Sequence, residues 1–398
     1  MLVWYNSSMQ EKKDLRNAKI VLKIFMEQGY EAYIVGGAVR DYILHQPLTD
    51  IDITTNAKPG QTSKLFRTIP TGIKYGTVTI VFGKALEQFE VTTYRGEGKY
   101  LDSRHPETVE WINHVEDDVK RRDFTINGLL MDSEGVIHDY VGGQKDIKDH
   151  ILRCIGDPVE RFDEDALRIL RLFYFQSKLG FDIEKNTFMA ACSESYKLDS
   201  LPNERVLQEI QKIISGDYFT KAVVSLHQTG VSKHLPGLEK GIEFFSKKTD
   251  YKPFSDTFYS LCFCLNGSVP EIWKFSNTTR HKYEMVLEIF STTNGYNALL
   301  VYQYGIDLLS LVNRVRNVLG IEPVLKNKIT EIYNTMPIKT ELDVRVTSDE
   351  LIALAGRKPG AWLGNLKKEL VKKVIIGELE NEKAVLLQFS KERLGIHK

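Results

Sequence analysis

The stretch that most constrains the fold of this 398-residue chain runs from Tyr33 to Thr55 and reads YIVGGAVRDYILHQPLTDIDITT. It begins with a short apolar run of the kind found in buried strands, and a pair of glycines interrupts that run. Residues 39–44 have the spacing of one or two turns of amphipathic helix. The closing Asp-Ile-Asp-Ile-Thr alternates polar and apolar residues, as a half-buried strand does. The stretch therefore predicts two strands with a short helix between them.

The second predicted strand carries two acidic residues on one face. Side chains on a strand repeat every two residues, so Asp50 and Asp52 point to one side while Ile51 and Ile53 point to the other. Two neighbouring carboxylates repel each other unless protons or cations compensate their charge. Because Mg²⁺ prefers carboxylate oxygens, usually one or two of them together with substrate phosphates, the pair predicts a magnesium site.

The glycines before this strand predict a phosphate site. Gly36 and Gly37 let backbone N–H groups approach an anion, the following helix favours negative charge at its N-terminus, and Arg40 can bind a phosphate. An Asp-x-Asp alone is common on solvated strand edges, and a Gly-Gly pair alone is usually only a turn. In combination, GGAVRD followed by DID indicates a nucleotidyl transfer centre, with its metal and phosphate sites in one small unit.

This combination resembles the nucleotidyltransferase core of the DNA polymerase β superfamily, and more narrowly that of class II tRNA nucleotidyltransferases and bacterial poly(A) polymerases. The resemblance implies an α+β protein, in which an N-terminal nucleotidyltransferase head with a mixed β-sheet and helices precedes an all-α neck, body and tail. Strand signals stop near Gln144, as this organisation requires. We expect the catalytic head at residues 1–142, a neck that selects the base at 143–215, the body at 216–320 and a tRNA-binding tail at 321–398.

A third acidic residue lies on another expected strand. Thr77–Phe82 and Gln88–Tyr94 alternate or run apolar, and Glu90 lies between two apolar neighbours in the second of them. The geometry of the superfamily implies a third carboxylate on a strand next to the aspartate pair, and Glu90 is the candidate. The alternative is an ordinary glutamate on the surface of a strand.

The segment RRDFTIN, residues 121–127, is the second motif of the resemblance. Paired arginines can present bidentate donors to a triphosphate, although an exposed helix start capped by an aspartate explains RRD equally well on its own. The full motif resembles the second motif of the class II tRNA nucleotidyltransferases. This resemblance implies that Arg122 contacts the nucleotide and that Asp123 and Asn127 order the site.

A helix is expected over Glu160–Phe181, where apolar residues leave one polar stripe at Asp165, Arg168 and Arg171. The ordinary explanation is an intrahelical Asp–Arg pair, which contributes only about 0.2–0.5 kcal/mol. However, EDALRILR resembles the motif with which the family selects incoming CTP or ATP without a template. The resemblance implies that Asp165 and Arg168 read the base and that Arg171 supports the triphosphate or the pair. The family often places another arginine where this chain has Tyr174, so the triphosphate contact of that arginine is not carried over.

Two further segments carry specificity hypotheses. Arg95–Pro106 is rich in glycine and charge, which predicts a mobile loop. It is either a plain surface loop or, by resemblance, the flexible loop that full CCA-adding enzymes carry and CC-adding relatives lack. Near the C-terminus, basic residues gather around a tryptophan, which suits either a solvated helix face or a tRNA backbone contact. They are Arg357, Lys358, Trp362, Lys367, Lys368, Lys372 and Lys373.

The overall composition limits which of these functions and locations are possible. Lys+Arg and Asp+Glu balance at 53 each, so RNA binding requires basic residues to cluster locally. No apolar run is long enough to span a membrane, and the N-terminus lacks a basic region followed by an apolar one. Four scattered cysteines suit neither a disulfide framework nor a zinc site. These features predict a cytoplasmic protein.

The function implied by the resemblance is template-independent addition of C, C and A to the 3′ end of tRNA, with CTP and ATP as substrates and pyrophosphate as product. Two Mg²⁺ ions held by Asp50 and Asp52 would assist the reaction, and Gly37, Arg40 and Arg122 would bind the triphosphate. The partner is tRNA, through its 3′ end and its acceptor and T arms. No protein partner is required, and a homodimer is left open. The alternatives are a poly(A) polymerase, a CC- or A-adding relative, or a non-catalytic RNA-binding protein on the same scaffold.

Overall fold

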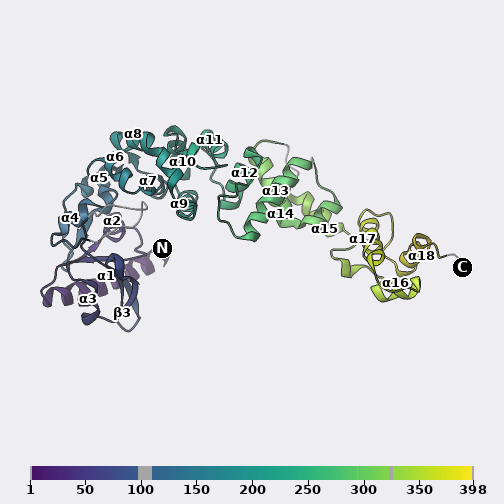
Figure 1. Cartoon of the computed structure of the whole chain (residues 1–398), viewed down its shortest axis with the longest axis horizontal. Helices are drawn as coiled ribbons and strands as arrows, with labels where there is room; N and C mark the ends of the chain where they lie inside the picture. Colours follow the sequence, from purple (N-terminus) through teal and green to yellow (C-terminus); the bar gives the residue numbers. More distant parts are fainter. Residues whose placement is uncertain (1, 97–109, 294, 322–325, 397–398) are drawn as a thin grey trace. The chain divides into compact units, whose positions relative to one another are not determined.

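The computed structural model describes residues 2–96, 110–293, 295–321 and 326–396, except for the side chains of 2–14 and 326. Most of the loop expected at Arg95–Pro106 therefore lies outside the described residues. The chain divides into two compact units, which are Met1–Lys252 with Ile272–Lys274, and Pro253–Glu271 with Phe275–Lys398 (Figure 1). The predicted boundaries at 142 and 215 fall inside the first unit and the one at 320 inside the second, so the four-domain division stays a prediction.

The first unit contains a sheet of seven strands among the described residues, in the order β3-β4-β5-β2-β1-β6-β7. Neighbouring strands are antiparallel, except that β2 and β5 run parallel, which makes the sheet mixed as expected. The strands are β1 (Ala32–Val35), β2 (Asp52–Thr55), β3 (Thr68–Gly72), β4 (Thr77–Phe82), β5 (Glu87–Thr93), β6 (Leu129–Met131) and β7 (Ile137–Asp139).

Helices and 3₁₀ turns connect and cover these strands. α1 (Leu2–Glu27) buries Leu22 and Phe25, whose ring centroid lies 5.0 Å from that of Phe66. The others of this region are α2 (Gly37–Ile43), α3 (Pro59–Leu65), α4 (Val115–Lys120) and the 3₁₀ turns η1 (Ile73–Tyr75) and η2 (Thr125–Asn127). α3 ends at Leu65, because the chain becomes extended at Phe66 and then forms β3.

The rest of the first unit is mainly helical. Its helices are α5 (Gly143–Asp149), α6 (Pro158–Glu164), α7 (Leu167–Leu179), α8 (Lys185–Glu194), α9 (Asn203–Ser215), α10 (Phe219–Gln228) and α11 (Glu239–Lys247), with η3 (Ser195–Ser200) and η4 (Val231–His234). The expectation that strands end near Gln144 is wrong in one detail. Two short parallel strands, β8 (Ile151–Leu152) and β9 (Asp182–Ile183), pair with each other, and strands of two residues are too short to show alternation.

The second unit consists of helices among the described residues. They are α12 (Ser255–Asn266), α13 (Asn277–Thr292), α14 (Ala298–Val318), α15 (Lys326–Thr335), α16 (Ser348–Ala355), α17 (Ala361–Ile375), α18 (Lys383–Leu394) and η5 (Glu341–Asp343). α14 is kinked at Gly305, whose φ of 76° is non-helical. Two separate apolar cores hold this unit together, one around Val286 and Leu309 and one around Leu351 and Leu370. Among the helices described in either unit, none combines the length and apolar character that crossing a bilayer requires.

Candidate active site

The acidic residues meet at the start of β2. Asp52 pairs with Val35 of β1 on one side and with Glu90 of the parallel strand β5 on the other. Ile51 is buried and Asp52 exposed, so the two faces expected from the alternation are observed. Asp50, also exposed, lies two residues before the strand begins, and the strand is thus shorter than expected. The register places the candidate third carboxylate directly beside Asp52.

This crowding of acids changes the protonation of Asp52. Its pKa is raised to about 6, first because neighbouring groups remove part of its hydration and then because of the negative charge of Glu90. Arg122 opposes the rise, and Asp50 adds to it. A bound cation would relieve this repulsion.

The side chains near Asp52 limit which metal ion could bind there. In the part of the chain that the structure describes, no three or more His, Cys, Asp or Glu side chains form a group able to hold a metal. Mg²⁺ commonly takes only one or two carboxylates and completes its shell with water and substrate phosphates. The acid pair therefore fits a magnesium site that is completed by a nucleotide.

The glycine turn follows directly after the residue that pairs with Asp52. Gly36 has a φ of 74°, a left-handed conformation that glycine adopts without steric cost, and Gly37 begins α2. A side chain at Gly36 would lie 3.6 Å from Nη1 of Arg122. The turn thus brings the first motif against the second, although 85 residues separate them in the sequence.

Arg122 is held in place by a buried carboxylate. Its Nη2 lies 3.1 Å from Oδ2 of Asp118, which is fully buried and also accepts hydrogen bonds from Arg121. Burial alone would raise the pKa of Asp118, but the two arginines outweigh it, so the pKa is lowered. Nε of Arg122 is buried and has no hydrogen-bond partner among the described residues. A donor left unpaired beside the glycine turn is suited to a phosphate oxygen.

Arg40 is less accessible than the sequence analysis expected. The residue is 3% exposed, its Nη1 donates to Oδ1 of Asn127 at 2.6 Å, and its Nε donates to Oδ1 of Asp41 at 2.8 Å. Its guanidinium also lies 5.2 Å from the ring centroid of Phe175. These contacts join α2 to the RRDFTIN segment and to α7. Direct phosphate binding by Arg40 stays a prediction.

Arg171 connects α7 to the same segment. Its Nε and Nη2 donate to Oδ2 of Asp123 at 2.8 and 2.6 Å, and Nδ2 of Asn127 donates to Oδ1 of that carboxylate at 3.0 Å. Burial would raise the pKa of Asp123, but the Arg171 charge and these hydrogen bonds lower it. These contacts join Asp123 and Asn127 to α7, and the role in ordering the site that the resemblance implies for them stays a prediction.

The polar stripe of the expected helix is arranged differently from the prediction. The helix is broken after Glu164, so Asp165 lies between α6 and α7, where its Oδ1 accepts from the backbone N–H of Leu167 at 3.0 Å. Its Oδ2 accepts from Nη2 of Arg205 on α9 at 3.1 Å. Asp165 thus pairs with a residue of another helix, Arg205, whereas the sequence analysis considered only a pair within one helix.

Arg168 is fixed by other partners. Its Nη1 donates to Oε2 of Glu164 at 2.5 Å and to the carbonyl of Arg161 at 2.9 Å, and its Nη2 donates to the carbonyl of Arg121 at 2.8 Å. It is 8% exposed. The last contact joins α7 to the RRDFTIN segment.

Two residues in this arrangement were missed by the sequence analysis. Asp118 precedes Arg121 and Arg122 by three and four residues, and Glu164 precedes Arg168 by four. Those separations place side chains on one face of a helix, so the signal was present in the sequence. It was weak because such pairs are common on solvated helices.

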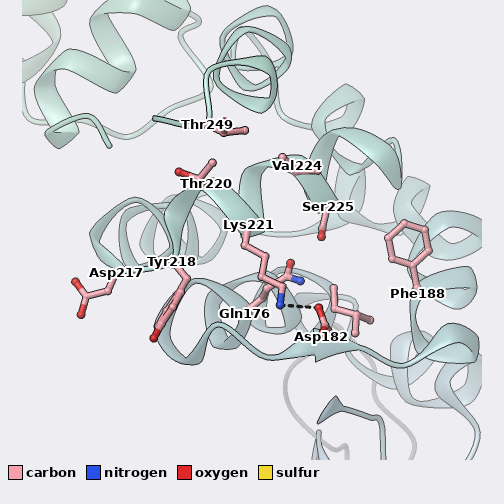
Figure 2. Close-up of a pocket in the computed structure, with 11 residues that line it drawn as sticks. Gln176, Asp182, Phe188, Asp217, Tyr218, Thr220, Lys221, Val224, Ser225 and Thr249 are labelled. Carbon is pink, nitrogen blue, oxygen red and sulfur yellow. Dashed lines mark ion pairs between the residues drawn. The ribbon is translucent and has the colours of Figure 1, made fainter. Parts of the chain in front are cut away.

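A cavity of about 820 Å³ in the first unit lies apart from these residues. Figure 2 shows it between α7, α8 and α10, with Nζ of Lys221 2.5 Å from Oδ1 of Asp182 at its edge. None of the predicted catalytic or nucleotide-binding residues is among the described residues that line it.

The fold and this site define a nucleotidyltransferase with a polymerase-type head. The family described as "Poly A polymerase head domain" matches residues 32–153, "Probable RNA and SrmB- binding site of polymerase A" matches 180–242, and "tRNA nucleotidyltransferase domain 2 putative" matches 257–390. The CCA-adding enzyme of Bacillus cereus is 32% identical over 394 residues, which cover 95% of this chain and 98% of that protein. The chain belongs to the family of CCA-adding enzymes.

Solved structures agree with this family. The Bacillus stearothermophilus CCA-adding enzyme in complex with CTP matches with a TM-score of 0.79 and 30% identity, over 95% of this chain and 96% of that one. The Thermotoga maritima CCA-adding enzyme complexed with tRNA matches with a TM-score of 0.65 over 94% of each chain, but at 19% identity it supports the fold alone. The expected α+β class and the expected enzyme class are confirmed.

Proposed function

We propose that this enzyme adds C, C and A to the 3′ end of tRNA without a template, uses CTP and ATP, and releases pyrophosphate. The observation that carries the proposal is the register of Asp52 with Glu90 beside the Gly36 turn. The relative in complex with CTP and the Bacillus cereus CCA-adding enzyme, both named above, support these substrates. In this scheme residues 1–142 carry out the chemistry, 143–215 select the base, and 321–398 bind tRNA.

The residues of the chain divide the work as follows. Arg122, with its unpaired Nε, binds the triphosphate beside the Gly36–Gly37 turn. Asp123 and Arg171 hold the RRDFTIN segment against α7, which keeps Arg122 and the base-selection residues in fixed relative positions. Such preorganisation lowers the cost of aligning the RNA 3′-hydroxyl with the α-phosphate. Asp165 and Arg168 select the base by hydrogen bonding, which rejects bases that leave a buried polar group unpaired.

Asp50 and Asp52, with Glu90 beside them, would hold magnesium, two ions by the resemblance. Bound there, magnesium would lower the pKa of the attacking hydroxyl and neutralise charge on the leaving pyrophosphate. The raised pKa of Asp52 fits this assignment, because a bound cation stabilises the ionised form of carboxylates that repel one another.

The proposal is tested by incubating the full chain with Mg²⁺ and tRNA that lacks its last three nucleotides, then sizing the products at single-nucleotide resolution. CTP alone should add two nucleotides, and CTP with ATP should add three and stop. With tRNA ending in CC, ATP alone should add one. Long tails with ATP would instead indicate a poly(A) polymerase, and products that stop at two or begin only after CC would indicate a CC- or A-adding enzyme. If no product forms, the remaining alternative is a non-catalytic RNA-binding protein.

A further inference from the structure

A groove of about 520 Å³ runs along α7 and α9 in the first unit. We call it the α7–α9 groove, and the side chains that the argument uses are Tyr174, Lys178, Gln208, Gln211, Lys212 and Ser215. Tyr174 is half-buried, whereas Gln208, Gln211 and Lys212 are exposed. Nothing in the proposed chemistry uses these side chains, and the larger cavity of Figure 2 shares only Asp217 with the groove among their described lining residues.

The groove lies next to residues of the candidate active site. Tyr174 follows Arg171 on α7 by three residues, and Nη2 of Arg171 lies 2.6 Å from Oδ2 of Asp123 in the RRDFTIN segment. Residues three apart on a helix are neighbours on its surface and are separated by about 4.5 Å along the axis. A group bound at Tyr174 would therefore lie close to the RRDFTIN segment.

The charges of the groove exclude one obvious ligand. Nζ of Lys178 lies 3.1 Å from Oδ2 of Asp41, Nζ of Lys212 lies 2.8 Å from Oε1 of Glu209, and Asp217 adds an acid at the edge. Because each lysine already has an acidic partner, the groove does not suit a triphosphate, which carries several negative charges. A single phosphodiester, with one negative charge, is compatible with this balance.

The remaining chemistry favours a base. The aromatic ring of Tyr174 lines the groove, Nζ of Lys212 lies 5.5 Å from its centroid, and the exposed amides of Gln208 and Gln211 offer both donors and acceptors. Aromatic platforms with nearby cations and amides are the means by which proteins bind unpaired nucleotides without requiring one sequence. An enzyme that accepts every tRNA needs such tolerance.

We propose that the α7–α9 groove positions an unpaired nucleotide near the 3′ end of the RNA substrate, with its base stacked on Tyr174 and its phosphate close to Lys212. This inference rests on the proposed function, because it requires an RNA substrate whose end reaches the site. It adds an RNA-positioning role for Tyr174, Gln208, Gln211 and Lys212 that is separate from selection of the incoming nucleotide.

The test compares two RNA hairpins that share one stem, one ending in three unpaired 3′ nucleotides and one blunt. Tyr174→Ala should weaken binding of the overhang hairpin roughly 5- to 150-fold, because base stacking on an aromatic ring contributes about 1–3 kcal/mol. Binding of the blunt hairpin and the KM for CTP should stay within twofold. Tyr174→Phe should restore binding, and Lys212→Gln should weaken it to a smaller extent and increasingly at low salt.

The matched control is Tyr196→Ala, since Tyr196 also has a lysine, Lys197, 5.8 Å from its ring centroid but lies on η3 outside the groove. It should leave both affinities unchanged. Equal loss on both hairpins, or no loss with Tyr174→Ala, would overturn the proposal, and a raised KM for CTP would assign the groove to the incoming nucleotide instead. Thermal melting of each variant identifies loss of folding. Nucleotide addition by the wild-type enzyme tests the proposed function independently of these results.

Discussion

Arg171 on α7 donates two hydrogen bonds to a single oxygen of Asp123, from Nε at 2.8 Å and from Nη2 at 2.6 Å. Asp123 belongs to the RRDFTIN segment, and Arg171 lies on α7, the helix that also carries Arg168, which we propose selects the base. The pair therefore connects the segment that would bind the triphosphate to the segment that would read the base. Because both donors belong to one planar guanidinium group, the two hydrogen bonds fix its orientation as well as its distance from Asp123.

The Asp123→Asn variant tests this connection. Removing one partner of a buried pair leaves the other charge uncompensated, so we expect the free energy of unfolding to fall by about 3 kcal/mol at neutral pH. The pKa of Asp123 is lowered from its ordinary value of 3.8, so its stabilising contribution is present above that value and is lost as pH falls through the lower, folded pKa. Denaturant melts from pH 7 to pH 3 should show the gap between wild type and variant closing at the acid end. A gap that stays constant would contradict the assignment.

A second prediction concerns the adjacent acids Asp117 and Asp118. Asp118 is fully buried and holds both Arg121 and Arg122, whereas Asp117 is exposed and pairs with Lys120 at 2.9 Å. We expect Asp118→Asn to lower the free energy of unfolding by about 3 kcal/mol and to raise the KM for CTP, because Arg122 loses its anchor. Asp117→Asn should change stability by less than about 1 kcal/mol. Calorimetry and steady-state kinetics on the two variants would distinguish the roles, and equal effects would remove Asp118 from the site.

The sequence predicted the parts of the site that depend on local spacing. The two faces of Asp-Ile-Asp-Ile-Thr follow from the strand period, and β4 begins and ends where the alternation does. The register that places Glu90 beside Asp52 could only be proposed by resemblance, because strand pairing depends on the whole sheet. Likewise, no helical period indicates that the chain breaks at Asp165 and pairs that residue with Arg205, which comes 40 residues later. Contacts between distant segments are set by packing, and packing leaves little trace in local sequence.

A third prediction follows from the raised pKa of Asp52. A carboxyl whose folded pKa lies above its unfolded value stabilises the protein below the unfolded pKa, near 3.8, and this contribution is lost as pH rises through about 6. Without Mg²⁺, we therefore expect Asp52→Asn to have a higher Tm than wild type at pH 7.5 and an equal Tm at pH 4. Scanning calorimetry in EDTA is the measurement. A lower Tm for the variant at pH 7.5 would indicate a structural aspartate.

Magnesium should stabilise the wild-type protein at pH 7.5 more than the Asp52→Asn variant. Adding Mg²⁺ with a CTP analogue that cannot be hydrolysed should raise the Tm of wild type at pH 7.5 more than that of Asp52→Asn, because binding to the folded state stabilises it. The rise should diminish below pH 6, where a proton competes for Asp52. In parallel, Asp52→Ala should abolish nucleotide addition while tRNA binding stays nearly intact. An unchanged Mg²⁺ response in the variant would place the metal elsewhere.

The last prediction concerns how Arg168 selects a base although its donors already bind the protein. Glu164 accepts from Nη1 of Arg168 at 2.5 Å and also pairs with Arg161, so it fixes the guanidinium plane. Arg168→Ala should reduce the preference for CTP over UTP, because it removes the guanidinium group that binds the base. Glu164→Gln should reduce this preference about tenfold, because the guanidinium group is then held less firmly; a hydrogen bond to a charged group contributes about 1.5–3 kcal/mol.

The control for Glu164 is its neighbour Asp163, which is largely exposed and pairs with Lys197 at 2.6 Å. Asp163→Asn should leave the CTP-to-UTP ratio of kcat/KM unchanged, and all three variants should bind tRNA like wild type. If Arg168→Ala lowers the ratio and Glu164→Gln does not, the carbonyls of Arg161 and Arg121 suffice to orient Arg168. If neither lowers it, base selection belongs to other residues, and the half-buried carboxylate of Asp165 beside Arg205 becomes the next to test. In both cases the ratio, not the rate, is the decisive quantity, because loosened packing alone would slow both nucleotides equally.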